Sequence, residues 1–595
     1  MEKIGFRIRI LSVFFILIWI VLLIRVFAIS IQSNNYYAQL AKKNITRKDI
    51  DVPFRGLIKD RNGELLALNE IGFSVALDPH LKEAELKKQI EFLQKFFPDI
   101  NPDELQKNYL KEQSAYNHTP IQVIKFISSE MMQHCYAYLI QNHFVFVEPA
   151  SKRFYTFGKS ASHVIGYVGA SNENDIAKNI VSKYTGIVGK TGLEREYNSF
   201  LQGQIGERIL TVDSHNRTIL VQYQKDTINQ NELTTTLDMR LQKIADEAFE
   251  DKNGSVIVMN VENGEILVAG SYPEYDLNDF VGGISFAKWN SLQDDLSNPL
   301  LNRLVNGLYA PGSVIKMGMA LAILEYAGIN EYTLVDTPGY IELGGRKFRD
   351  WKIGGHGKTD VIKAIRESVD VYFYKLSQQA GMTNLANVLS EMGFGSKTGV
   401  DLPNEFVGIL PSPEWKMSKG QPWYLGDTVI TSIGQGSFLV TPMQIARYTA
   451  LMATGMLPTP HFAKTFQDSP SEFESKDVLN EFQKSKLKFI QEGMYQACSS
   501  SKGTARRSTR DSILPLACKT GTAQVVSIPQ NIKVRVKESE LPYYHRSHAW
   551  ITGYVPAKNP KFAITVFIEH GEGGGRAGPI LARMANALKE LGYIK

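Results

Sequence analysis

The strongest constraint on how this chain folds is a long apolar segment near its N-terminus. No residue from Ile10 to Ile24 is charged, and after Arg25 the apolar character continues to Ile31. An α-helix over residues 10–31 would be about 33 Å long, which is enough to cross the hydrocarbon core of a bilayer. Arg25 lies near one end, where its long side chain can reach the headgroups. The segment therefore predicts a transmembrane helix.

Basic residues on one side of this segment predict its orientation. Lys3, Arg7 and Arg9 precede it, so the positive-inside rule places residues 1–9 in the cytoplasm and the rest of the chain outside it. A cleaved signal peptide is the alternative, because it also combines a basic start with an apolar run. The run is longer than such peptides usually carry, and no clear pair of small residues marks a cleavage site after it. We therefore predict a single-pass anchor over residues 10–31.

Composition excludes several classes of protein. The chain has 595 residues, of which 43% are hydrophobic and 21% are charged, a balance typical of a globular protein and not of a disordered one. A net charge of +5 over this length gives no reason to expect a nucleic-acid partner. Three cysteines without a CxxC spacing exclude a zinc ribbon or a disulfide scaffold. The sequence leaves open whether Cys498 and Cys518 form a bridge.

The region after the anchor is mixed and relatively polar as far as residue 232. Alternating stretches such as residues 73–77 predict short strands. Apolar residues three and four positions apart make residues 82–141 look largely helical, so we expect a helical head over about residues 80–145. Because residues 32–232 carry no catalytic motif, we interpret them as a non-catalytic pedestal.

The character of the sequence changes at about residue 233. The expected elements are a helix with Asp238 as its N-cap, strands at 255–259 and 266–269 joined through Asn263-Gly264, a strand at 562–568 and a helix at 579–591. Strands therefore stand at both ends of residues 233–595, with helices between them. This order predicts an α+β domain in which one sheet joins distant parts of the sequence.

Ser313 and Lys316 form the first candidate catalytic pair. Pro311-Gly312 breaks the chain, and Ser313 then stands at the start of an apolar helix. Serine at position i and lysine at i+3 share one helix face, where apolar neighbours would partly desolvate the amine and favour its neutral, proton-accepting form. A serine hydroxyl needs such a base to become a nucleophile. The N–H groups at the helix start could stabilise an oxyanion.

The Ser-x-x-Lys pattern is weak alone, because it also begins at Ser285, Ser485 and Ser499. Two later motifs decide which copy is catalytic. They are Ser368-Val369-Asp370, and Lys519-Thr520-Gly521-Thr522 on a predicted strand. A glycine in an edge strand lets a peptide approach the backbone, and adjacent lysine and threonine suit a substrate carboxylate.

Lys-Thr-Gly also occurs at residues 190–192, ahead of Ser313, and at 397–399, in a loop-like passage. Only the copy that begins at Lys519 lies in a strand context with a further strand after it. In this order, the three motifs are the acyl-transfer signature of penicillin-binding proteins and serine β-lactamases.

The sequence as a whole resembles the class B penicillin-binding proteins, most closely their elongation type. Supporting stretches are residues 55–63, 163–169, 192–197, 350–352, 355–357, 426–427 and 434–436. The resemblance implies an N-terminal transmembrane helix, an elongated mixed pedestal of the dimerisation type, and a transpeptidase domain with an antiparallel sheet flanked by helices. The implied boundaries are a tail at 1–9, the anchor at 10–31, the pedestal at 32–232 and the transpeptidase domain at 233–595.

The resemblance also implies a reaction, D,D-transpeptidation of peptidoglycan stem peptides during cell elongation and maintenance of cell shape. Ser313 would be acylated by the penultimate D-Ala carbonyl with loss of the terminal D-Ala, and an amine of a neighbouring stem would then form the cross-link. The implied roles are Lys316 as base, Ser368 and Asp370 as proton-relay and positioning pair, Lys519, Thr520, Gly521 and Thr522 as the carboxylate-binding strand, and the N–H groups of Ser313 and Thr522 as oxyanion hole. β-Lactams would acylate the same serine.

Two features depart from common family patterns. Asp370 stands where Asn is common, and an ionised Asp accepts hydrogen bonds but cannot donate one; elongation-type relatives tolerate this Asp. Asp350 and His356, with Asp336, resemble a zinc cluster of some relatives, but Val369 occupies the place of its cysteine. We therefore expect hydrogen bonds that order a loop, and no metal or other cofactor.

The remaining implications concern surroundings and alternatives. By resemblance, the chain would act on stem peptides and lipid-linked glycan strands in the bacterial inner membrane, with its catalytic domain in the periplasm. Its partners would be a SEDS-type glycan polymerase and a rod-complex scaffold protein. A septal transpeptidase, a hydrolase and a non-enzymatic β-lactam sensor or scaffold are the alternatives. Only nine residues precede the anchor, which disfavours a sensor with a cytoplasmic signalling segment.

Overall fold

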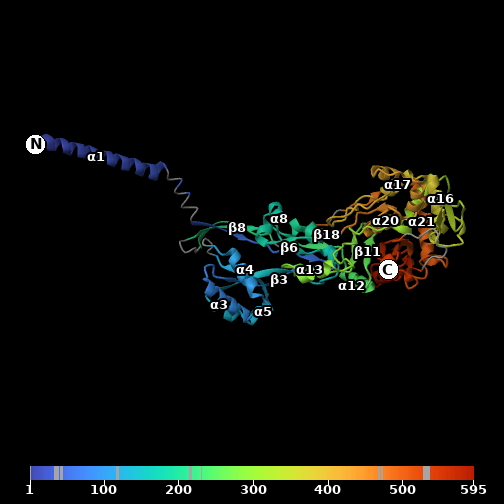
Figure 1. The fold of residues 1–595 in the computed structure, drawn as a ribbon, viewed down its shortest axis with the longest axis horizontal. Helices are drawn as coiled ribbons and strands as arrows, with labels where there is room; N and C mark the ends of the chain where they lie inside the picture. The colour runs from blue at the N-terminus through green and yellow to red at the C-terminus, as the bar shows by residue number, and fades with distance from the viewer. Residues whose placement is uncertain are drawn as a thin grey trace. The chain divides into compact units, whose positions relative to one another are not determined.

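The computed structural model describes residues 2–32, 36, 39, 45–114, 119–212, 218–228, 231–466, 469–470, 473–526 and 537–595. The chain divides into two compact units: Met1–Phe54 with Gly203–Asn229, and Arg55–Gln202 with Gln230–Lys595. Figure 1 shows the course of the chain.

The first unit contains the apolar helix and a small sheet. Helix α1 spans Glu2–Phe27 and continues as a π-helical turn, η1 (Ala28–Gln32). Within the described residues, Ile4–Ile31 is the one helix long and apolar enough to cross a membrane; it is dark blue in Figure 1. Three antiparallel strands pair in the order β1 (Thr46–Asp51), β8 (Gly206–Val212) and β9 (Thr218–Lys225). The predicted apolar helix is confirmed.

In the second unit, the pedestal is built on a long antiparallel pair of strands that are distant in the sequence. Strand β3 (Leu65–Leu77) pairs along its length with β5 (Val145–Tyr155) and also with β2 (Ile58–Lys59) and β4 (Ile121–Ser128). The head helices are α3 (Glu83–Gln94), α4 (Pro102–Glu112), α5 (Ser129–Gln133) and α6 (Tyr136–Ile140). They share one apolar core with β3 and β4.

The prediction that residues 82–141 are largely helical is wrong at β4. This strand buries Ile121, Val123, Ile124 and Ile127, a spacing that fits a helix as well as an irregular strand. It pairs with β3, and this tertiary partner decides its conformation.

Short elements complete the pedestal. They are α7 (Ser162–Ile165), β6 (Val168–Ala170), α8 (Glu173–Lys178), α9 (Val181–Thr185), β7 (Ile187–Gly189), α10 (Gly192–Glu196) and α11 (Asn198–Leu201). Glu194, fully buried on α10, binds Arg55 Nε at 2.6 Å and Arg153 Nε at 2.7 Å. Two cations paired with one buried carboxylate compensate part of its desolvation. This cluster joins the start of the pedestal to its end.

The pedestal and the C-terminal region, residues 233–595, share a sheet. Strand β10 (Leu233–Thr235) pairs in parallel with β2 and antiparallel with β18 (Ala463–Phe466), which continues to β19 (Ser469–Pro470). Asp401 extends this connection, because its carboxylate accepts hydrogen bonds from Tyr197 Oη at 2.8 Å and from the N–H of Phe462 and Ala463. The second unit is thus continuous across both regions.

A five-stranded antiparallel sheet forms the centre of the C-terminal region, in the order β12-β11-β23-β22-β21. Its strands are β11 (Gly254–Asn260), β12 (Ile266–Tyr272), β21 (Ala517–Ala523), β22 (His548–Val555) and β23 (Phe562–Ile568). The predicted Asn263-Gly264 hairpin joins β11 to β12, and β11 pairs with the distant β23. The predicted sheet that joins both ends of the region is confirmed.

Helices cover both faces of this sheet. Helix α12 (Met239–Phe249), with Asp238 as its N-cap, packs on one face together with α22 (Gly578–Glu590). Figure 1 shows the red C-terminal segment beside green α12 and β11. The main helices of the opposite face are α14 (Lys316–Tyr326), α16 (Asp370–Ala380), α17 (Met382–Glu391), α20 (Pro442–Thr454) and α21 (Glu481–Ser499).

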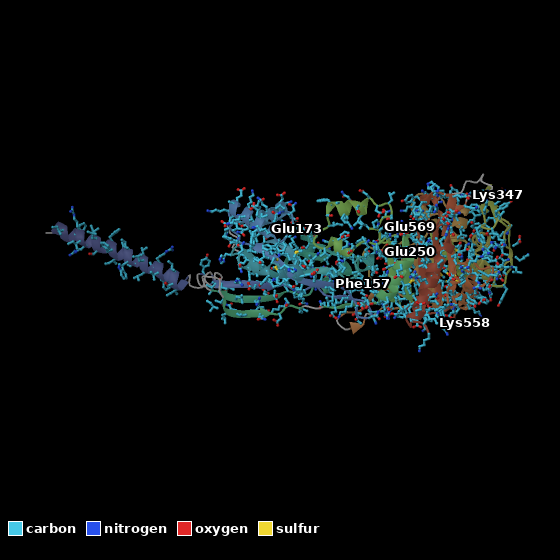
Figure 2. The ribbon with its side chains drawn as sticks, turned by 90° about the horizontal axis from the view of Figure 1, so that it is seen from below. Phe157, Glu173, Glu250, Lys347, Lys558 and Glu569 are labelled. Carbon is cyan, nitrogen blue, oxygen red and sulfur yellow. A yellow bond between two sulfur atoms is a disulfide. The ribbon has the colours of Figure 1, made fainter. Side chains whose placement is uncertain are left out.

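The remaining elements are short. The helices are η2 (Leu277–Phe280), α13 (Phe286–Gln293), η3 (Gly312–Ile315), α15 (Val361–Arg366), α18 (Pro413–Ser418), α19 (Leu425–Thr431), η4 (Glu538–Glu540), η5 (Tyr543–His545) and η6 (Gly574–Ala577). The strands are β13 (Val335–Thr337), β14 (Tyr340–Leu343), β15 (Arg346–Arg349), β16 (Gly357–Thr359), β17 (Met456–Leu457) and β20 (Lys476–Asp477). Lys347, labelled in Figure 2, lies on β15 of the β14–β15 hairpin.

Candidate active site

Ser313 lies on the 3-10 turn η3, directly before α14. Gly312 has a φ of +55°, and its N–H donates to the Gly434 carbonyl at 2.8 Å. A Cβ at position 312 would come within 2.7 Å of the Thr522 carbonyl oxygen. Glycine therefore lets the turn approach β21 closely, and Ser313, which is half-buried, lies beside that strand.

The close approach continues along β21. At Gly521, a Cβ would lie 3.0 Å from Val314 Cγ1 and 3.1 Å from the Pro311 carbonyl. Gln435 Nε2 donates to the Thr522 carbonyl at 2.9 Å and so anchors the C-terminal end of β21. The third motif and the serine turn, about 200 residues apart in the sequence, are thus brought together.

Lys316 is fully buried at the start of α14. Its Nζ forms an ion pair with Asp370 Oδ1 at 2.5 Å and donates to the Ser368 carbonyl at 3.0 Å and to Ser368 Oγ at 3.5 Å. The Phe373 ring centre lies 5.1 Å from the ammonium. Within the described residues, no hydrogen bond joins Lys316 to Ser313. The expected base therefore points toward the second motif in this structure.

Ser368 connects the two lysines. It has a φ of +55° in the turn between α15 and α16, a strained conformation for a residue other than glycine. Its Oγ accepts a hydrogen bond from Lys519 Nζ at 2.8 Å and a longer one from Lys316 Nζ. Backbone strain at a residue that joins two motifs is typical of a functional site.

Lys519 is also fully buried, and its other hydrogen bond goes to the Thr520 carbonyl at 2.9 Å. Burial, together with the charge of Lys316, holds the pKa of Lys519 well below its ordinary value, against the opposing influence of Asp370. Asp370 lies at the first position of α16, and burial raises the pKa of its carboxyl although Lys316 opposes this. The site thus holds two lysines and one carboxylate in a largely dry environment.

A chain of hydrogen bonds behind α16 fixes the position of Asp370. Asp350 Oδ2 accepts from the N–H groups of Asp370 at 2.9 Å and Val371 at 3.0 Å. His356 lies between two carboxylates, with Nε2 3.1 Å from Asp350 Oδ1 and Nδ1 3.0 Å from Glu367 Oε2. Burial alone would lower the pKa of His356, but its hydrogen bonds to the two carboxylates outweigh this effect and raise it.

These residues do not fit a zinc site. Both ring nitrogens of His356 face carboxylates, Val369 offers no ligand, and Asp336 is exposed on β13. In the part of the chain that the structure describes, no group of three or more His, Cys, Asp or Glu side chains could hold a metal ion. Asp350 and His356 instead hold the loop by hydrogen bonds, as their interpretation as loop-ordering residues expects.

Sequence reasoning missed three contributors to the site. Glu367 completes the chain through His356, Gln435 anchors the end of β21, and Thr504 Oγ1 accepts a hydrogen bond from Thr520 Oγ1 at 2.9 Å. The sequence signal for Glu367 was its position directly before Ser368. The signal for Gln435 was its position within the family-like stretch 434–436. No sequence signal pointed to Thr504.

The competing motif copies have other surroundings. Ser285 caps α13 by accepting from the Lys288 N–H at 3.3 Å, and Thr398 binds the buried Glu405 carboxylate. The copy at 190–192 leads into α10 in the pedestal. Among the motif copies in the described residues, the set of Ser313, Lys316, Ser368, Asp370 and Lys519 brings nucleophile, amines and carboxylate together. Such a set can activate a hydroxyl and stabilise an acyl-transfer intermediate.

Two family models match the chain, a penicillin binding protein transpeptidase domain over residues 254–587 and a penicillin-binding protein dimerisation domain over residues 50–235. The chain belongs to the class B penicillin-binding proteins. The predicted combination of an apolar N-terminal helix, a dimerisation-type pedestal and a transpeptidase domain is confirmed, as is the prediction of a serine acyl-transfer enzyme.

Similar proteins carry consistent names. The chain is 34% identical to a peptidoglycan D,D-transpeptidase MrdA of Acinetobacter baumannii (91% of this chain, 81% of that protein) and 32% identical to MrdA of Haemophilus influenzae (89% and 83%). A solved complex of penicillin-binding protein PBP2 with MreC from Helicobacter pylori is 52% identical, with a TM-score of 0.86 over 92% of this chain and 99% of that one. These penicillin-binding relatives support the elongation-type prediction over the septal alternative.

Proposed function

We propose that this class B penicillin-binding protein cross-links peptidoglycan stem peptides through an acyl-enzyme on Ser313. One observation carries the assignment of roles: the Ser368 hydroxyl accepts hydrogen bonds from both Lys316 and Lys519. Lys316 directly follows the turn that places Ser313 beside β21. We assign this chemistry to residues 233–595, and a non-catalytic role to the pedestal at 32–232.

Acylation begins with the transfer of the Ser313 proton to Lys316. Lys316 must first be neutral, and Asp370 can hold the ammonium proton because burial favours the protonated form of its carboxyl. Ser313 Oγ then attacks the penultimate D-Ala carbonyl. The N–H groups of Ser313 and Thr522 stabilise the oxyanion, the peptide C–N bond breaks, and the departing D-Ala amine receives the proton through Ser368. The hydrogen bond between Ser313 and Lys316 forms with substrate bound, as is common for catalytic contacts.

Deacylation completes the exchange. An amine of a second stem peptide attacks the Ser313 ester and loses a proton to the same relay. The C–O bond of the ester breaks, Lys316 returns the proton to the Ser313 oxygen, and the new amide replaces the ester. Before acylation, Lys519, Thr520 and Thr522 bind the terminal carboxylate of the donor, and Gly521 admits the peptide to the strand edge. The negative charge of this carboxylate in turn stabilises the ammonium form of Lys519 and so counteracts the effect of burial, which favours the neutral amine.

Covalent labelling tests the proposal. Labelled penicillin should attach to Ser313, identified by mass spectrometry of the labelled peptide, and a Ser313→Ala chain that still binds the label covalently would refute the assignment. Adding an amine acceptor to a donor peptide separates the transpeptidase from the hydrolase alternative: cross-linked product supports the former, and free acid alone supports the latter.

We also propose the location and the partners. Lys3, Arg7 and Arg9, which precede the apolar segment at 10–31, favour a cytoplasmic N-terminus and a periplasmic catalytic domain in the inner membrane. Cysteine labelling from either side of the membrane tests this, and cytoplasmic labelling of the catalytic domain contradicts it. Relatives were solved with MreC and as a peptidoglycan synthase complex, which supports a scaffold protein and a SEDS-type polymerase as partners. Co-purification of the full-length chain from membranes tests both.

A further inference from the structure

The turn after α21 places Thr504 between the second and the third motif. The Thr504 N–H donates to the carbonyl of Arg366, two residues before Ser368, at 3.3 Å. Its side chain meets β21, where Thr520 Oγ1 lies 2.9 Å from Thr504 Oγ1. One threonine therefore contacts the segments that carry both motifs.

This turn is held rigidly against β21. The Cys498–Cys518 disulfide ties the end of α21 to the residue before Lys519. Gly503 packs so closely that a Cβ there would come within 2.4 Å of the Ala497 carbonyl oxygen, and the N–H of the fully buried Ala505 donates to that carbonyl at 3.0 Å. The position of Thr504 is thus determined by its neighbours on both sides.

The hydroxyl pair has a chemical consequence. A carboxylate only accepts hydrogen bonds, and the Thr520 hydroxyl has a single proton, which it shares with Thr504 in this structure. If both hydroxyls rotate, Thr504 donates to Thr520 Oγ1 and Thr520 donates to the carboxylate. The pair can therefore serve as a short hydrogen-bond chain that directs the Thr520 proton to an incoming anion.

The surrounding charge favours an anion as well. Lys502, Arg506 and Arg507 flank Thr504 in the sequence and are exposed. A cluster of cations raises the local concentration of anionic ligands. Donor stem peptides end in a carboxylate, so positive charge on this turn favours their approach.

We infer that Thr504 is a positioning residue of the carboxylate-binding subsite, where it orients the hydroxyl of Thr520 toward the terminal carboxylate of the donor peptide. The inference rests on the proposed function of β21. It predicts a loss that depends on the charge of the substrate terminus, since a purely structural role would affect all substrates alike.

The test compares two probes on the full-length chain: a thioester substrate that ends in a free carboxylate, and the methyl ester of the same thioester. Acylation of Ser313 releases the thiol, whose rate is measured for the unchanged chain and for Thr504→Val, Thr504→Ser and Thr509→Val. Thr509→Val is the matched control, because this buried hydroxyl in the same segment binds the Ala505 carbonyl at 3.0 Å.

Thr504→Val should lower kcat/KM about tenfold for the carboxylate probe, the upper range for a hydrogen bond between neutral groups, and change it less than twofold for the methyl ester. Thr504→Ser should restore most of the loss, and Thr509→Val should not discriminate between the probes. An equal loss for both probes, or no loss for either, overturns the inference. If the unchanged chain releases no thiol from either probe, or Ser313→Ala still does, the proposed function itself fails, and this outcome is distinct.

Discussion

Removing the Asp370 carboxylate would leave Lys316 buried without its ion-pair partner. The two charged groups lie 2.5 Å apart, and Lys316 is fully shielded from solvent. At an effective dielectric constant of about 20, the attraction at this distance is roughly 7 kcal/mol, of which desolvation offsets a large part. Breaking a buried pair by removing one partner typically costs about 3–5 kcal/mol, and we expect this loss for Asp370→Ala.

For a cooperative unit as long as the transpeptidase match, residues 254–587, an unfolding entropy of about 2.1 cal/mol/K per residue converts this cost to a fall of about 4–7 °C in Tm. Differential scanning calorimetry measures it. Asp370→Asn should lose less stability than Asp370→Ala, because its amide oxygen still accepts a hydrogen bond from Lys316. The rate of acylation by penicillin should nevertheless fall about 10²-fold or more if Asp370 holds the Lys316 proton.

Asp336→Ala removes an exposed carboxylate from nearby β13 and serves as the matched control, with no expected change in Tm. If Asp370→Ala melted at the same temperature as this control, Lys316 would not depend on Asp370. If Asp370→Asn were acylated at the unchanged rate, Asp370 would have no part in proton transfer.

Two further predictions concern stability. Replacing Cys498 and Cys518 by serine opens a loop with a sequence separation of 20 residues and should lower the free energy of unfolding by about 3 kcal/mol; chemical denaturation measures this, and an unchanged midpoint would contradict the bridge. Because the pKa of Lys519 is lowered in the folded state, the unfolded chain binds more protons between that value and 10.5, so stability contributed by this residue rises with pH across the window. Lys519→Met should remove that rise, and an identical pH profile in the variant would show that Lys519 titrates normally.

Local signals in the sequence predict the elements of this fold better than its contacts. The Asn263-Gly264 hairpin and the Asp238 N-cap follow from short stretches whose backbone preferences are strong by themselves, and both are present. Strand β4 was missed because its apolar residues also fit a helical spacing, and only pairing with β3 decides between the two. Local pattern is therefore ambiguous where a tertiary partner makes the choice.

The same distinction applies to the site. The order of the three motifs predicts which residues gather, because the chemistry constrains their types and spacing. The hydrogen-bond partner of each side chain does not follow from the order of the motifs. Lys316 contacts Asp370, His356 contacts Glu367, and Thr520 contacts Thr504. These contacts depend on how α15, α16 and α21 pack around β21, and no short stretch of sequence encodes that packing. The Cys498–Cys518 bridge could not be predicted for the same reason.

The parallel pairing of β10 with β2 limits how this enzyme can be shortened. A chain that starts at Leu233 would retain β18 on one side of β10 and expose a bare row of backbone donors and acceptors on the other. It would also uncover the apolar side chains that Ile58, Leu66 and Leu193 now cover. Such an unpaired edge recruits other chains, so a truncated enzyme should self-associate, and soluble fragments for inhibitor screening should begin no later than Arg55.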